Sequence, residues 1–116
     1  MKAYYARPIT HYNTESDKKA LCFLRGLGLE IEDPNQEKYQ VAYKEKGMEV
    51  FLEAIDTCNL LVFRSLWNGK VTAGVLKEVS HAYHNNIPVM EYRPTISNTR
   101  EMSVEETRKA IKIGMK

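Results

Sequence analysis

The sequence predicts a small α/β fold of the flavodoxin-like or Rossmann-like kind, a three-layer sandwich with helices on both faces of a parallel sheet. Short apolar runs at 59–63 and 87–92 have the length of buried strands, and a helix-periodic segment separates them. Strands that alternate with helices along a chain are typical of parallel sheets with right-handed crossovers. We therefore expect four parallel strands in the order 2-1-3-4.

Length and composition indicate one ordinary globular domain over residues 1–116. The chain is 43% hydrophobic and 28% charged, and its formal net charge is +2. A nearly neutral chain gives no reason to expect nucleic-acid or membrane-surface binding. The sequence leads straight into a strand-like segment, and no apolar run approaches the ~20 residues of a membrane span, so we expect a cytoplasmic protein. Cys22 and Cys58 lie in helical apolar patterns and are expected to be buried free thiols.

The first half of the chain contains two strand-like segments around one helix. Residues 2–6 are rich in Tyr and end at a turn-prone Arg-Pro pair, so they predict a strand. Apolar residues at helical spacing predict a helix over 14–26, with Asn13 or Thr14 as its cap. Alternation over 29–32 predicts a second strand. Residues 36–46 are polar and could be irregular or a loose helix.

In the second half, helices precede and follow the strand at 59–63. Apolar residues recur at i, i+3, i+4, i+7 and i+10 from Met48, which predicts an amphipathic helix to residue 58. A further helix is expected over 72–85, before the strand at 87–92. Residues 95–102 are turn-like, and a capping box beginning at Ser103 predicts a final helix of about ten residues.

Several familiar chemistries are excluded by missing motifs. The chain has no phosphate-binding loop ending in Gly-Lys-Ser or Gly-Lys-Thr, and no Gly-x-Gly-x-x-Gly follows the first strand. The third strand ends in Phe63 and Arg64, where a phospho-acceptor receiver domain needs a carboxylate. Histidines at 11, 81 and 84 lack zinc-ligand spacing. We expect neither a metal nor an organic cofactor.

Glu78 is the candidate reactive residue. Ligand sites of parallel sheets lie at the carboxyl ends of the strands, where the segment after Phe63 is expected. Glu78 follows Gly74 and Val75 by one turn, so it flanks the inner stripe of its helix. Gly74 allows a ligand to approach the helix backbone closely. The alternative is a solvated surface glutamate.

Four segments, in their order and spacing, resemble the nucleoside 2-deoxyribosyltransferase family and its relatives, the deoxynucleoside 5′-monophosphate N-glycosidases. The resemblance covers about residues 2–92. The segments are the Tyr-x-Ala-x-Pro motif at 4–8, the second strand with its Pro-Asn turn at 28–35, the helix-to-strand passage at 55–63, and the Gly-(x)3-Glu-(x)3-Ala helix at 74–82, which precedes Ile-Pro-Val at 87–89.

The resemblance implies a catalytic role for Glu78. In the family the helix glutamate is the nucleophile that attacks the anomeric carbon of a deoxyribose, as in retaining glycosidases. Tyr4 matches the tyrosine that orients this carboxylate, although Tyr5 could exchange roles with it. The family also uses a carboxylate to assist the leaving base. Asp56 is our candidate for that acid, with Glu53 as an alternative.

Asn59 departs from the family, which commonly has an Asp at this position, the start of the third strand. Arg7 and Arg64 follow strands at the expected ligand edge, and either could hold a phosphate or be solvated. Trp67 could stack on a base or cover a dimer interface. The remaining expected substrate contacts are Tyr5, Pro8, Gly74, Ser97 and Asn98, and relatives supply phosphate-binding residues at the last two positions to the neighbouring subunit.

The sequence therefore predicts an enzyme that cleaves or transfers at the N-glycosidic bond of a (deoxy)nucleoside or its 5′-monophosphate. A homodimer or higher homo-oligomer is expected. One alternative is a non-catalytic nucleotide-binding or sequestering module on the same fold. A second is an interaction scaffold in which Glu78 is merely solvated.

Overall fold

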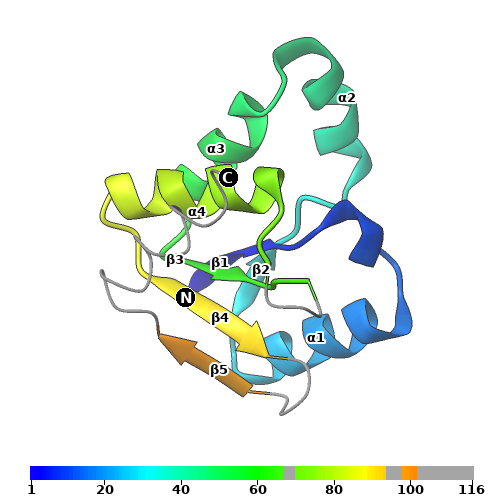
Figure 1. Ribbon diagram of the computed structural model, residues 1–116, viewed down its shortest axis with the longest axis vertical. Coiled ribbons are helices and arrows are strands. Elements are labelled where there is room, and N and C mark those ends of the chain that lie inside the picture. The colour runs from blue at the N-terminus through cyan, green and yellow to red at the C-terminus, as the bar shows by residue number, and fades with distance from the viewer. Residues whose placement is uncertain (67–69, 94–97, 102–116) are drawn as a thin grey trace.

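The computed structural model describes residues 1–66, 70–93 and 98–101 (Figure 1). Within them lies a five-stranded sheet in the order β2-β1-β3-β4-β5. The strands are β1 (Lys2–Ala6), β2 (Glu30–Glu32), β3 (Leu60–Phe63), β4 (Val89–Arg93) and β5 (Asn98–Glu101). The first four are parallel, so the predicted order 2-1-3-4 is confirmed.

Helices cover both faces of the sheet, as predicted (Figure 1). They are η1 (Ile9–His11), α1 (Glu15–Gly26), α2 (Glu37–Lys46), α3 (Glu49–Asp56) and α4 (Ala73–His84). One core cluster joins the sheet to α3 and α4, and a second joins the opposite face to α1. None of the helices among the described residues is long and apolar enough to cross a membrane.

The alternation of β1 determines what each face receives. Tyr4 and Ala6 belong to the core on the α3 and α4 side, whereas Ala3 and Tyr5 belong to the core on the α1 side. Successive side chains of a strand point to opposite faces, so the two neighbouring tyrosines are separated by the sheet. Both are fully buried.

Three local expectations were settled by the structure. The segment over 36–46, which could be irregular or helical, forms α2. Thr14 is the cap of α1, and its hydroxyl accepts a hydrogen bond from the Asp17 backbone N–H at 3.1 Å. The turn-like interpretation of 95–102 is wrong for 98–101, which pair antiparallel with β4. The strand β5 is defined by its backbone pairing with β4. Its sequence has no apolar alternation from which a strand could be predicted. The helix expected from Ser103 lies outside the described residues.

The cysteine prediction is half right. Cys22 and Cys58 are both free thiols, but only Cys58 is buried. Ala20 and Leu24 turn the inner stripe of α1 towards the sheet. Cys22 lies midway between them on the helix and therefore faces the opposite side, towards solvent.

Arg7 ties the end of β1 to two other elements. Its Nε and Nη2 donate to the Asp17 carboxylate of α1 at 2.8 and 3.0 Å, and its Nη1 donates to Asp33 Oδ1 at 2.6 Å, just after β2. The Arg7 side chain is fully buried and that of Asp17 nearly so. A buried charge must be paired to be tolerated, so this three-residue cluster fixes the segment after β1 against α1 and the β2–α2 connection.

We expect Asp17→Ala to lower the free energy of unfolding by about 2–4 kcal/mol, because it leaves the buried Arg7 with only one carboxylate. Urea denaturation followed by circular dichroism measures the change. The control is Glu15→Ala in the same first turn, where the carboxylate is exposed and should matter much less. Equal losses in the two variants would contradict the structural role of the cluster.

Candidate active site

A cavity of about 290 Å³ opens beside the carboxyl end of β1. Its walls come from β1 and the segment after it, from Pro34, from α3 and the residue before it, and from the first turns of α4. The volume is close to the lower end of ordinary small-molecule sites, about 300–1,000 Å³. The strand ends thus carry a pocket where the parallel topology predicts one.

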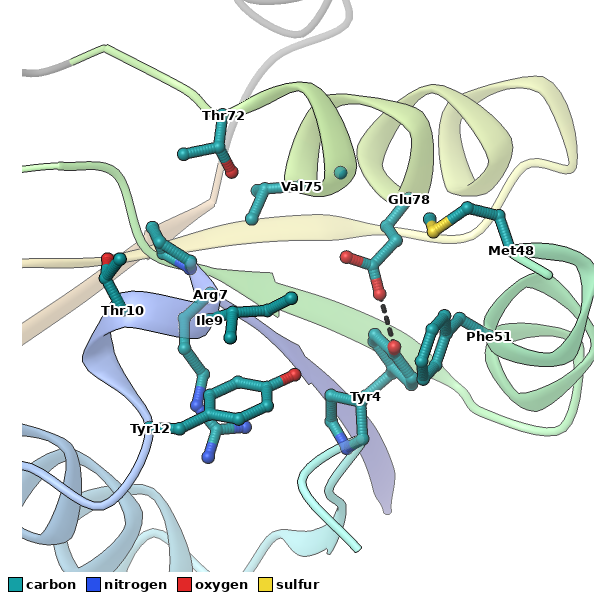
Figure 2. A pocket seen from close by; sticks show the side chains of 13 residues that line it. Tyr4, Arg7, Ile9, Thr10, Tyr12, Met48, Phe51, Thr72, Val75 and Glu78 are labelled. Atoms are coloured by element: carbon teal, nitrogen blue, oxygen red, sulfur yellow. Dashed lines mark hydrogen bonds between the residues drawn. The ribbon is translucent and has the colours of Figure 1, made fainter. Parts of the chain in front are cut away.

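Glu78 forms one wall of this cavity. The inner stripe of α4 runs through Val75, Val79 and Ala82, and the phase of the helix places Glu78 beside that stripe. The residue is only 7% exposed. Figure 2 shows its carboxylate pointing from α4 into the cavity and towards Tyr4. The alternative of a solvated surface glutamate is therefore wrong.

Tyr4 is the hydrogen-bond partner of Glu78. Its hydroxyl donates to Glu78 Oε2 across the gap between β1 and α4 (Figure 2). Burial and the adjacent negative charge hold the pKa of Tyr4 far above its ordinary value, so the phenol stays protonated and acts as a donor. Tyr5 faces α1 instead. Of the two tyrosines considered, the structure brings Tyr4 to the carboxylate.

The environment of Glu78 changes its ionisation. Burial raises the pKa of the Glu78 carboxyl to about 7, while the Tyr4 hydrogen bond and the charge of Arg7 oppose that rise. The protonated and the ionised forms of the carboxyl are therefore both accessible near neutral pH. A strongly shifted carboxyl in a cleft is typical of functional sites.

The rest of the lining supplies an apolar wall and the hydroxyl groups of Thr10, Tyr12 and Thr72. Met48 and Phe51 line the cavity from the α3 side. Opposite them the Tyr12 ring stacks on the Arg7 guanidinium at 4.5 Å, and Figure 2 shows its hydroxyl pointing into the cavity. Burial raises the pKa of Tyr12 to about 12, so it too stays protonated. Sequence reasoning missed these residues, since Tyr12 lies in a polar segment without periodicity and the α3 residues fit a plain core stripe.

The structure brings together only some of the predicted site residues. The five that line the cavity are Tyr4, Arg7, Pro8, Gly74 and Glu78. Trp67 and Ser97 lie outside the described residues, and Asn98 begins the edge strand β5.

Asp56 does not line the cavity, and its prediction as a site residue is not supported. It is the exposed last residue of α3, and its Oδ1 lies within hydrogen-bond distance of His81 Nε2, at 2.7 Å. Because α3 leads into β3, its end lies at the amino edge of the sheet, away from the carboxyl edge. Glu53 is exposed on the same helix. Glu78 is the only carboxylate among the described residues of the cavity wall.

The two arginines have different surroundings, and neither is solvated. Arg7 lines the cavity, but two carboxylates already occupy its guanidinium, so it is a structural cation rather than an open phosphate ligand. Arg64 is also buried, on the α1 side. The described residues contain no group of three or more His, Cys, Asp or Glu side chains that could hold a metal.

No family model, curated protein or solved structure matches this chain. The resemblance to nucleoside 2-deoxyribosyltransferases therefore depends on the four sequence segments.

We expect Glu78→Gln to stabilise the protein increasingly from about pH 4.5 to pH 7. The folded pKa of about 7 lies above the ordinary carboxyl value, so the ionised form costs stability as the pH rises. The gain should be near zero below pH 4 and reach about 3 kcal/mol above pH 7. Tyr4 still has an amide oxygen to donate to.

Chemical denaturation at a series of pH values tests this expectation. The control is Glu30→Gln, an exposed substitution of the same kind on β2. A stability difference for Glu78→Gln that does not change with pH would show that the buried carboxyl titrates normally.

Proposed function

We propose that this protein is an enzyme that cleaves or transfers at the N-glycosidic bond of a (deoxy)nucleoside or its 5′-monophosphate. The observation that carries the proposal is the buried Glu78 carboxylate, held by the Tyr4 hydroxyl in the wall of a small-molecule cavity. These two residues occupy the positions that the resemblance assigns to the nucleophile and its orienting tyrosine.

The first step is a displacement at the anomeric carbon. Glu78 Oε2 is held by Tyr4, and the other carboxylate oxygen points into the cavity (Figure 2). That oxygen attacks C1′ of the sugar, the C1′–N bond breaks, and its electron pair leaves with the base. Glu78 then carries the sugar as a neutral ester. Because burial disfavours the charged carboxylate, ester formation removes an unfavourable buried charge.

The second step releases the sugar from Glu78. Water attacks C1′ in a hydrolase, and a nitrogen of a second base attacks it in a transferase. In either case the attacking group loses its proton to the departed base anion, the C1′–O bond to Glu78 breaks, and the carboxylate is regenerated. The wall formed by Met48 and Phe51 suits a flat heterocycle, and the Tyr12 hydroxyl is placed to donate a hydrogen bond to it. Asp56 has no part in this proposal.

The second candidate is a non-catalytic nucleotide-binding module. It is favoured by the absence of a second carboxylate from the described cavity wall, because base departure normally needs an acid. The scaffold alternative loses its premise, since Glu78 is buried. A cytosolic homodimer belongs to the main proposal, and the two free thiols are consistent with a reducing compartment.

We expect the purified protein to release free base from at least one deoxynucleoside or deoxynucleoside 5′-monophosphate, measured by chromatography. Glu78→Gln should lower the turnover rate by about 10³-fold or more, because it removes the nucleophile. Glu30→Gln should leave turnover unchanged. Parallel reactions with a second free base distinguish transfer from hydrolysis, since only transfer gives a new nucleoside.

Absence of turnover on every substrate, together with binding that Glu78→Gln leaves intact, would contradict the enzyme and favour the binding module. Isothermal titration with the same substrates provides that comparison.

The rate should depend on the ionisation of Glu78. We expect kcat/KM to rise with pH through about 7 and to level off above it, because the ionised carboxylate is the reactive form. Tyr4→Phe removes a hydrogen bond that lowers the pKa of Glu78, so the rising limb should move to higher pH. A limb that stays in place would show that another group controls the rate.

A further inference from the structure

Arg64 is a buried cation without a counter-ion among the described residues. It follows β3, is 7% exposed, and its Nη2 donates to Ser16 Oγ of α1 at 2.6 Å. Its Nε and Nη1 have no hydrogen-bond partner in the described part of the chain. Arg7 follows the neighbouring strand β1, but Asp17 and Asp33 neutralise its charge. An unpaired buried charge is costly, so its retention needs an explanation.

The other buried polar atoms without partners lie in the same region. Among the described residues, such side-chain atoms belong only to Tyr5, His11 and Arg64. Burial, followed by the charge of Arg64, lowers the pKa of His11. Burial raises the pKa of Tyr5 to about 12, and the Arg64 guanidinium, which approaches the Tyr5 hydroxyl without reaching hydrogen-bond geometry, opposes that rise. Unpartnered buried groups are rare, and three residues together indicate a ligand that satisfies them.

The available groups are mainly donors. Arg64 offers guanidinium N–H groups, and the protonated Tyr5 offers its hydroxyl. Ser16 adds a hydroxyl in the first turn of α1, where the helix dipole favours negative charge. Donors on separate elements suit a tetrahedral anion, whose oxygens accept from several directions.

We propose that Arg64, Tyr5 and Ser16 form a binding site for a phosphate group, on the α1 side of the sheet. The phosphate is either free or a monoester. The site does not depend on the proposed reaction, because Tyr5 and Arg64 do not line the Glu78 cavity. Tyr5 lies on the opposite face of the sheet from Tyr4, which contacts Glu78.

The first test is thermal denaturation of the full chain in inorganic phosphate and in chloride at equal pH and ionic strength. About 20 mM phosphate should raise the Tm of the wild type by about 2–5 °C. Arg64→Met should abolish this rise. Arg25→Gln removes an exposed arginine from the last turn of α1 and should retain the rise.

Arg64→Met also separates a binding role from a structural one. Without phosphate the variant should have a Tm at least as high as the wild type, because it removes an unpaired buried charge. A wild-type Tm that ignores phosphate would overturn the proposal, as would a phosphate response that survives in Arg64→Met.

A nuclear magnetic resonance titration of His11 tests the location in the unmodified protein. Bound phosphate offsets the charge of Arg64, so the pKa of His11 should rise towards its ordinary value. The exposed His84 on α4 provides a reference signal. A wild-type Tm response without any change at His11 would place the anion elsewhere and overturn the site.

Competition identifies the source of the phosphate. The Glu78→Gln variant is used so that no turnover occurs. A deoxynucleoside 5′-monophosphate should displace inorganic phosphate from it if the monoester occupies the site, whereas the parent nucleoside should not. If neither displaces it, the site binds free phosphate.

Discussion

The two-residue period of β1 is the constraint on which the rest of the structure depends. Tyr4 turns towards α4 and meets Glu78, while Tyr5 turns towards α1 and lies beside Arg64. A shift of one residue in the strand register would exchange the two faces and separate the carboxylate from its donor. The parallel pairing of β1 with both β2 and β3 holds this register.

The charges of the site follow from this division. Arg7 is placed beside the Glu78 cavity, but its pairing with Asp17 and Asp33 limits the positive field that the cavity receives. The effect of burial on Glu78 therefore exceeds that of Arg7 and Tyr4, and its pKa is raised. Because the same two aspartates pair with Arg7, Arg64 on the α1 side remains a buried cation without a counter-ion among the described residues. The Arg7 cluster thus limits the positive charge that acts on Glu78 and supplies no carboxylate to Arg64.

The sequence was sufficient for features that depend on local periodicity. The strand order follows from apolar runs separated by helical segments, and the position of Glu78 beside the inner stripe of α4 follows from helical phase. The pairing of Tyr4 with Glu78 needed the family resemblance, because the residues are 74 positions apart.

Other features depend on contacts that no local pattern records. The cluster of Arg7, Asp17 and Asp33 joins three elements, and each residue alone is an ordinary charged side chain. Asp56 was misplaced because sequence proximity to β3 does not say at which edge of the sheet a residue lies. The strand β5 was missed because backbone pairing with β4 defines it rather than an apolar alternation.

The position of β2 has a consequence for self-association. It is an edge strand of only three residues, and two of them are glutamates. Short, charged edges resist the addition of a strand from another molecule. An assembly of two copies that continues the sheet across the β2 edge is therefore disfavoured.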